Sequence, residues 1–308
     1  MTQNQEQPQN PDDQIDLLDL FLALWAGKWL IVTMTLVFAV GSVAYALSLP
    51  NIYTAEALLS PANSEQSTQV PAQLGSLASL AGVNIGGGSS NEAVLAMEVL
   101  KSRAFISDFI RRHDLEVPLM ATDGWNSEDG EWVINPEVYN AKTQTWLKDE
   151  EGKSLEPTDW DLVKAFRGNH FSLSQSSENG MITLSIKSQS PKAAQQWVTW
   201  LVEDINEHIR EQDVREANKR IDYLRNKLEE TSITGMQKVF YQLIESETRT
   251  VMLASASDEY VFETIDPAVV PEEKSEPARA LICVIITVLG GMLGVFTVLA
   301  RAFMHTGN

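Results

Sequence analysis

The stretch from Trp29 to Leu49 reads WLIVTMTLVFAVGSVAYALSL, and the stretch from Ala280 to Ala300 reads ALICVIITVLGGMLGVFTVLA. Each is 21 residues long and contains no Asp, Glu, Lys, Arg or His. A helix of about 20 apolar residues crosses the hydrocarbon core of a bilayer, because each residue adds about 1.5 Å. The alternative for each stretch is a buried helix of a soluble protein, but such helices rarely stay uncharged for so long. The sequence therefore predicts two transmembrane helices, 29–49 and 280–300.

The residues before the first stretch separate a retained anchor from a cleaved signal peptide. A signal peptide has a basic start, a short apolar stretch and a cleavage site with small residues. Residues 1–28 are acidic instead, with one basic residue, Lys28, against Glu6, Asp12, Asp13, Asp16 and Asp19. The first stretch is therefore predicted to remain as an anchor, with a short amphipathic helix over residues 16–24 before it.

Two spans place both termini on one side of the membrane and residues 50–279 on the other. The tails, residues 1–28 and 301–308, are too short to fold, so residues 50–279 form the working domain. The basic residues beside the spans divide between the two sides and do not fix the orientation. We expect this domain to be exported, because long segments are translocated with little regard to their charge.

The charge of the chain excludes several kinds of partner. The formal net charge is −19, and 37 of the 42 acidic residues lie within 50–279. Nucleic acids need clusters of Lys and Arg, and an acidic surface does not dock flat on anionic lipids. Cys283 is the only cysteine, so the sequence predicts no disulfide and no cysteine-based metal site.

Hydrophobic periodicity predicts mixed helices and strands in residues 50–279, and hence an α+β fold. After a strand at 53–60, a Gly- and Ser-rich stretch at 61–91 is expected to be a flexible connector. The other predicted elements are a helix from Asn91 to Arg112, a hairpin of strands 171–175 and 181–187, a helix from Pro191 to about Glu230, a break at 231–235, a return helix from Met236 to about Ala254, and a strand at 259–265.

The helix over 191–230 is the longest predicted element, at about 60 Å. Ser190 and Pro191 give it a cap residue and a proline in the first turn. It carries one apolar stripe at near-3.6 spacing and dense charge elsewhere. The stripe is predicted to pack against the return helix, against another subunit, or against both. Its central members are Leu201, Ile205, Ile209, Ile221, Leu224 and Leu228.

The approach to the second span and the span itself carry two further patterns. Pro267, Pro271 and Pro277 should keep the chain extended, because proline lacks an N–H and disfavours helix in the residue before it. Gly290, Gly291 and Gly294 offer a small-residue face in the membrane. Such a face lets another helix approach closely, either the first span, a neighbouring subunit or another protein.

Candidate enzyme chemistry is weak throughout the sequence. Gly152-Lys153-Ser154 lacks the earlier Gly of a nucleotide loop, since position 147 is Leu. His113, His170 and His208 lie far apart in the sequence and show no ligand spacing, and no Gly-x-Ser-x-Gly elbow occurs. A hydrolase could use an acid pair from Asp123, Glu128, Asp129 and Glu131, but a solvated loop is favoured there. We predict no catalytic residue, no cofactor and no metal.

Several stretches in order resemble Wzz-type chain length determinants, the polysaccharide co-polymerases of Gram-negative bacteria in their short form without a kinase domain. They are Ile15–Leu20 leading to Trp25–Trp29, Ile52–Ala55, Leu77–Gly82, Leu100–Arg103 with Phe105 and Ile106, and the prolines at 267, 271 and 277 with the glycines at 290, 291 and 294.

The resemblance implies a non-catalytic regulator in the inner membrane, with both termini cytoplasmic and the main domain periplasmic. Such proteins form homo-oligomeric rings and set the modal length of a polymer, such as lipopolysaccharide O-antigen, that a separate polymerase makes. The growing lipid-linked polysaccharide is a further expected partner. The alternative is an adaptor for capsule or exopolysaccharide export that works with a separate tyrosine kinase. A transmembrane sensor would need a cytoplasmic output domain, which the short tails do not supply.

Overall fold

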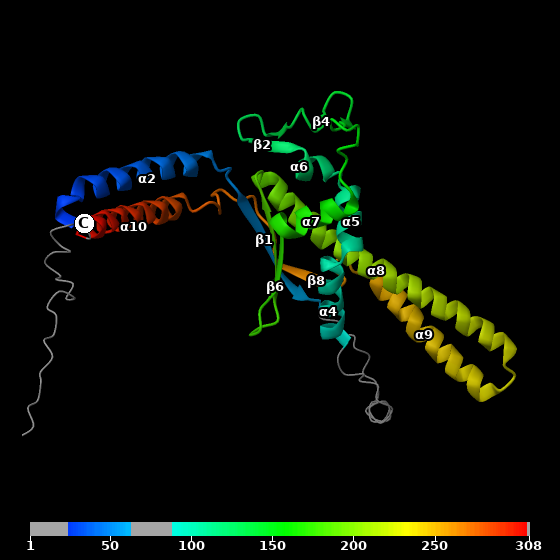
Figure 1. Ribbon diagram of the computed structural model, residues 1–308. Coiled ribbons are helices and arrows are strands. Elements are labelled where there is room, and N and C mark those ends of the chain that lie inside the picture. The colour runs from blue at the N-terminus through cyan, green and yellow to red at the C-terminus, as the bar shows by residue number, and fades with distance from the viewer. Residues whose placement is uncertain (1–23, 63–87, 307–308) are drawn as a thin grey trace, which may run out of the picture. The chain divides into compact units, whose positions relative to one another are not determined.

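The computed structural model describes residues 24–62 and 88–306 (Figure 1). The chain divides into two compact units, residues 1–51 with 275–308, and residues 52–274. The predicted amphipathic helix at 16–24, apart from its last residue, and most of the predicted connector at 61–91 lie outside the described residues.

The first unit consists of two long apolar helices that lie side by side, α2 (Lys28–Ser48) and α10 (Arg279–Thr306). Both are long and apolar enough to cross a membrane. Residues 301–306, predicted as part of a short tail, instead continue α10. The helix propagates there because no Gly or Pro interrupts it before Gly307.

A four-stranded antiparallel sheet forms the base of the second unit, in the order β6-β7-β1-β8. Its strands are β1 (Tyr53–Pro61), β6 (Phe171–Gln175), β7 (Ile182–Ser188) and β8 (Phe262–Asp266). Every second residue of β7 is buried, so one face of the strand points into the core. Opposite β7, Ala55 of β1 pairs with Ile186 and Ala57 pairs with Leu184.

Helix α8 (Pro191–Glu230) packs along β1 and β7 and then extends beyond them (Figure 1). Ser190 caps it by accepting a hydrogen bond from the backbone N–H of Ala193 at 3.2 Å. Helix α9 (Thr234–Ala256) returns along α8. The break between them is three residues rather than the predicted 231–235, because Gly235 is accommodated inside the first turn of α9.

The predicted single helix from Asn91 to Arg112 is two helices, α4 (Gly88–Lys101) and α5 (Arg103–Arg112). Ser102 between them has an extended backbone, and its Oγ accepts a hydrogen bond from the N–H of Phe105 at 3.2 Å. The side chain thus caps a new helix instead of continuing the old one.

Residues 116–170 form short elements that the sequence did not predict. They are α6 (Glu116–Met120), the hairpin β2 (Thr122–Asn126) with β3 (Glu131–Ile134), the hairpin β4 (Tyr139–Asn140) with β5 (Thr145–Trp146), α7 (Asp159–Ala165) and the π-helix η2 (Phe166–His170). The predicted α+β fold is confirmed, with two long apolar helices that flank, in the sequence, a mixed domain with a long helical projection.

Candidate functional site

The candidate site is the helical hairpin of α8 and α9, together with the contacts that root it in the sheet. Its root lies at Asn206, which is 3% exposed. The Asn206 Oδ1 accepts hydrogen bonds from the backbone N–H of Val261 at 2.8 Å and of Phe262 at 2.9 Å. Its Nδ2 donates to the carbonyls of Val202 and Phe262, each at 3.1 Å. The buried amide therefore ties α8 to β8 with its full hydrogen-bonding capacity.

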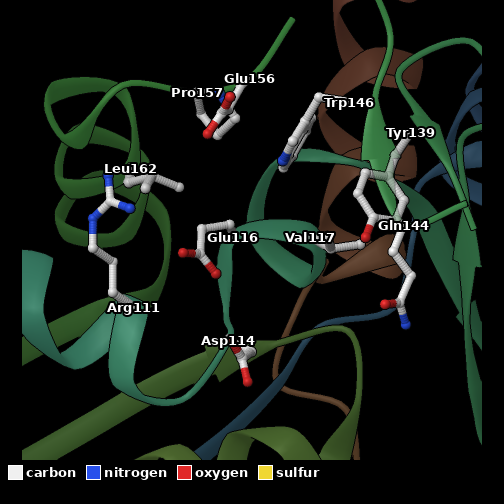
Figure 2. Close-up of a pocket in the computed structure, with 10 residues that line it drawn as sticks. All are labelled: Arg111, Asp114, Glu116, Val117, Tyr139, Gln144, Trp146, Glu156, Pro157 and Leu162. Atoms are coloured by element: carbon white, nitrogen blue, oxygen red, sulfur yellow. The ribbon is translucent and has the colours of Figure 1, made fainter.

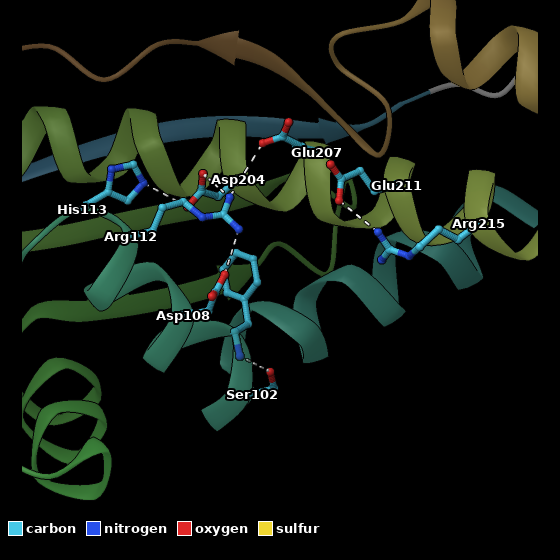
Figure 3. Close-up of polar contacts among 9 residues, drawn as sticks. Ser102, Asp108, Arg112, His113, Asp204, Glu207, Glu211 and Arg215 are labelled. Atoms are coloured by element: carbon cyan, nitrogen blue, oxygen red, sulfur yellow. Dashed lines mark hydrogen bonds and ion pairs between the residues drawn. The ribbon is translucent and has the colours of Figure 1, made fainter.

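A charged cluster holds α5 against α8 (Figure 3). The Asp204 carboxylate accepts a hydrogen bond from Arg112 at 3.3 Å and lies 3.0 Å from His113 Nε2. The His113 ring also stacks on Trp200, with ring centroids 4.2 Å apart. Asp108 binds the same guanidinium at 2.8 Å. These contacts fix the orientation of the third and fourth turns of α8 relative to α5.

Further along the hairpin, polar and apolar contacts join α8 to α9. Arg220 Nε on α8 lies 3.0 Å from Glu247 Oε2 on α9. Tyr260, just after α9, donates its hydroxyl proton to Asp213 on α8 at 2.8 Å. Partial burial and that hydrogen bond raise the pKa of Tyr260 far above its ordinary range. Ala254 is buried, while Phe240 and Ile244 are half-buried on the same face of α9.

The predicted stripe on α8 divides between two environments. Leu201, Ile205 and Ile209 lie in the main core over the sheet. Ile221 is also buried, and Leu224 and Leu228 are half-buried further along the helix. A large part of this stripe is therefore covered by the chain itself.

A second apolar line, on α9, was missed by the sequence reasoning. Met236, Val239 and Leu243 are 47%, 50% and 46% exposed. Their i, i+3, i+7 spacing places them on one face of the helix, beside the face that packs on α8. The same spacing is visible in the sequence, but the sequence does not show which apolar residues of α9 pack on α8 and which stay exposed. Exposed apolar residues on the same hairpin are Tyr223, Ile233, Tyr241 and Met252.

The three glycines of α10 lie against α2. A Cβ at Gly290 would stand 2.4 Å from Phe38 Cβ, and one at Gly294 would stand 3.1 Å from the Cα of Ile31. Gly291 faces Thr35 at ordinary contact distance. The first apolar helix of the same chain thus occupies the small-residue face, one of the partners that the sequence left open.

The prolines lie where the chain passes from β8 to α10. Residues 267–278, all within the described part of the chain, form neither a helix nor a strand. Pro267 and Pro271 follow β8, and Pro277 stands two residues before α10 begins. At the start of α10, Arg279 donates to the Leu49 carbonyl at 2.9 Å and to Asn51 Oδ1 at 3.0 Å.

Two of the stretches that the sequence offered as candidate enzyme sites, at Lys153 and at Glu128 with Asp129, lie in exposed turns. Lys153 lies in an exposed turn in which the Asp149 carboxylate accepts from the backbone N–H groups of Glu151 and Lys153. The loop of Asp129 and Glu128 is exposed, and Asp129 accepts a hydrogen bond from Asn126. Residues 24–62 and 88–306 contain no group of three or more His, Cys, Asp or Glu side chains placed to hold a metal ion.

Residues 13–113 match the family model of Wzz, described as chain length determinant protein. Residues 232–303 match a second family model, GNVR, described as a G-rich domain on putative tyrosine kinase. The chain carries a Wzz chain length determinant domain. The described part of this Wzz domain contains α2, β1, α4 and α5, and the G-rich domain contains α9, β8 and most of α10. Residues 114–231, including all of α8, lie between the two matches.

Two solved structures are similar to this Wzz-domain chain at low identity. A full-length bacterial polysaccharide co-polymerase aligns at a TM-score of 0.44 and 13% identity, over 96% of this chain and 99% of that one. A fragment of WzzB, a polysaccharide co-polymerase from Salmonella Typhimurium, aligns at a TM-score of 0.32 and 11% identity, over 73% of this chain and 100% of the fragment. No curated protein matches this chain significantly.

Proposed function

We propose that this protein is a non-catalytic regulator of surface polysaccharide length, with lipopolysaccharide O-antigen as its polymer. It assembles with copies of itself into a ring in the bacterial inner membrane and sets the modal length that a separate polymerase makes. The match of residues 13–113 to the chain length determinant family is the observation that carries this proposal.

The exposed apolar line on α9 supports the self-assembly. A row of half-exposed apolar side chains, Met236, Val239 and Leu243, costs free energy in water, and a second copy of the chain can cover it. A homo-oligomer is favoured as the occupant because the same hairpin supplies exposed aromatic rings, Tyr223 and Tyr241, that can pack on a neighbour. Charged side chains around the line would then set the register between subunits.

The membrane topology belongs to the same proposal. Helices α2 and α10 both span the inner membrane, which leaves both termini in the cytoplasm and residues 50–279 in the periplasm. The close packing of α10 on α2 at Gly290 and Gly294 supports two neighbouring spans, since bilayer helices associate through small residues. The growing lipid-linked polymer would then meet the protein on the periplasmic side.

Deletion of the gene tests the function. Surface lipopolysaccharide is separated on a gel from the wild-type strain, the deletion strain and the deletion strain with the gene restored. The proposal predicts a clustered distribution of band lengths in the wild-type strain. The distribution should become random in the deletion strain and clustered again when the gene is restored. An unchanged ladder would remove O-antigen as the polymer, and unchanged lengths of capsule and exopolysaccharide as well would overturn length control.

A second candidate is an export adaptor that works with a separate tyrosine kinase. The match of residues 232–303 to a G-rich domain described on putative tyrosine kinases favours it. Purification of the tagged protein from its own strain distinguishes the two: a co-purifying tyrosine kinase supports the adaptor, and its absence beside a changed lipopolysaccharide ladder supports length control.

A further inference from the structure

A cavity of about 440 Å³ lies where α5, α6 and α7 meet the β4–β5 hairpin (Figure 2). Its size falls in the usual range for small-molecule sites, roughly 300 to 1,000 Å³. Helix α5 contributes Arg111, α6 contributes Glu116, and the hairpin contributes Tyr139 and Trp146. The lining thus converges from segments that are separate in the sequence, which is how binding sites are commonly built.

One wall of the cavity is aromatic. Tyr139 and Trp146 pair across the β4–β5 hairpin, and their rings meet edge to face with centroids 5.2 Å apart. Figure 2 shows both rings on one side of the cavity, with the guanidinium of Arg111 on the other side and Glu116 between them. The Tyr139 and Trp146 side chains are both half-buried. Aromatic rings in this setting offer a flat apolar surface with a polar tip, suited to the C–H face of a sugar ring.

The polar groups around the cavity are mostly hydrogen-bond acceptors. Asp114, Glu116 and Glu156 supply three carboxylates, and Gln144 supplies an amide. Carboxylates accept several hydrogen bonds each and suit a ligand with neighbouring hydroxyl or amine donors. The same three negative charges repel an anionic ligand such as a uronic acid or a phosphate.

The positive charge at the cavity is already neutralised. Among the described residues that line it, Arg111 is the only basic one. The Arg111 Nε donates to Asp159 Oδ1 at 2.9 Å, and its Nη2 contacts the same oxygen. With the guanidinium held in this pair, the lining keeps a net negative charge.

The backbone is unusual at two points of the same lining. Asp114 and Gln144 each have a φ of 52°, and they are the non-glycine residues with positive φ in the described part of the chain. The left-handed conformation costs an ordinary residue about 1–2 kcal/mol. Such conformations cluster at ligand sites, where the surrounding structure holds them. Both of them line this one cavity.

The cavity also lies outside the parts that the family models describe. Of its lining residues, Arg111 falls within the Wzz match, and the others lie between residues 114 and 162. Most of the cavity lining therefore comes from a segment that neither match covers. Binding at this cavity would accordingly be a property of this chain rather than of the two matched domains.

We propose, resting on the function proposed above for the nature of the polymer, that this cavity binds one sugar residue without negative charge. The ring of the sugar packs on Trp146 and Tyr139. Its hydroxyl or amine donors bond to Glu116 and Asp114. A neutral or amine-bearing residue of the growing polysaccharide fits this chemistry, and an acidic residue does not.

Binding to the purified full-length protein tests the proposal, in a detergent without a sugar headgroup. The probes are maltotetraose and chitotetraose (neutral), the chitosan tetramer (cationic) and the galacturonic acid tetramer (acidic), titrated by calorimetry or saturation-transfer NMR. We expect saturable binding of a neutral or cationic probe and none of the acidic one. Trp146→Ala and the near-isosteric Glu116→Gln should each weaken binding by about tenfold or more. Trp160→Ala is the matched control, because Trp160 is 61% exposed and does not line the cavity.

Several results would overturn the proposal. They are the absence of binding by all three non-acidic probes, equal binding by wild type and both cavity variants, equal weakening by Trp160→Ala, or preference for the acidic tetramer. Tetralysine that binds in place of the sugars, with the same sensitivity to Trp146→Ala, would assign the cavity to a basic side chain of a protein partner. The binding test is independent of the polymer-length test. Length control without binding overturns the cavity proposal alone, and binding with unchanged lengths of lipopolysaccharide, capsule and exopolysaccharide overturns length control alone.

Discussion

The buried amide of Asn206 bonds to both backbone polar groups of Phe262, accepting from its N–H at 2.9 Å and donating to its carbonyl at 3.1 Å. This pair joins the middle of α8 to the first residue of β8. The hairpin of α8 and α9 is therefore rooted in the sheet by side-chain hydrogen bonds as well as by apolar packing. We call this set of hydrogen bonds from Asn206 to Val261 and Phe262 the joint between the hairpin and the sheet.

Replacement of Asn206 by Leu should destabilise the protein by about 2–4 kcal/mol, because buried backbone groups at Val261 and Phe262 lose their partners. The measurement is urea unfolding of the full chain in detergent, followed by tryptophan fluorescence. Gln196→Leu, at an exposed position on the same helix, is the control and should change little. A loss from Asn206→Leu no larger than that of the control would show that the joint contributes nothing.

Replacement of Gly290 by Ala should weaken the packing of α10 on α2. The added Cβ would stand 2.4 Å from Phe38 Cβ, so the helices must separate, at a cost of about 1–3 kcal/mol. Gly41→Ala is the matched control, because nothing lies within 4 Å of a Cβ built there. The thermal midpoint of the detergent-solubilised protein should fall for Gly290→Ala and stay or rise for Gly41→Ala. Equal midpoints for the two variants would argue against this helix contact.

The pair of Arg220 and Glu247 should contribute about 0.5–1 kcal/mol to the hairpin, since Arg220 is half exposed to solvent. A double-mutant cycle with Arg220→Gln and Glu247→Gln isolates this term from the bond that Arg220 also makes to Glu216. The coupling energy should shrink in high salt. A coupling of zero at low salt would show that this ion pair contributes nothing to the contact of α8 with α9.

The free energy of unfolding should decrease as the pH falls, and His170 should account for part of this decrease. Burial lowers the pKa of His170 in the folded state, although a hydrogen bond from Nδ1 to the Lys187 carbonyl at 2.7 Å opposes part of this shift. The unfolded chain, with an ordinary histidine pKa of about 6.5, then takes up a proton that the folded chain does not. This contribution is full above that pKa and is lost as pH falls through it toward the lowered folded value.

His170→Gln keeps a donor for the Lys187 carbonyl and does not titrate. Urea unfolding between pH 7.5 and 5 should therefore show a flatter pH dependence for this variant than for wild type. His208→Gln serves as the control for removal of a histidine elsewhere on the second unit. Parallel curves for wild type and His170→Gln would contradict the assignment.

The sequence was most informative where one period governs a whole element. Strand β7 alternates strictly, and α8 has a cap, a first-turn proline and an unbroken stripe, so both were predicted within a residue or two. Ser102 was not predicted as a break, because serine can either cap a helix or sit within one, and tertiary packing of α5 decided between these.

The cavity could not be predicted from the sequence. Strands β4 and β5 have two residues each, too few for a period, and the Tyr139–Trp146 pair that joins them is a cross-strand contact. Glu116 and Glu156 line the same cavity only because α6 packs on α7. Among many acidic residues, their spacing along the chain carries no sign of a shared site.

The most direct test of the account combines assembly and polymer length in one strain. The deletion strain receives wild type, the double variant Val239→Glu with Leu243→Glu, or Thr248→Glu, whose residue lies on the other side of α9. We predict that the double variant is made at normal abundance, that its complex in detergent is smaller, and that its polymer lengths are random. Thr248→Glu should keep both the wild-type complex and the clustered lengths. A double variant that loses assembly and yet keeps clustered lengths would contradict the account.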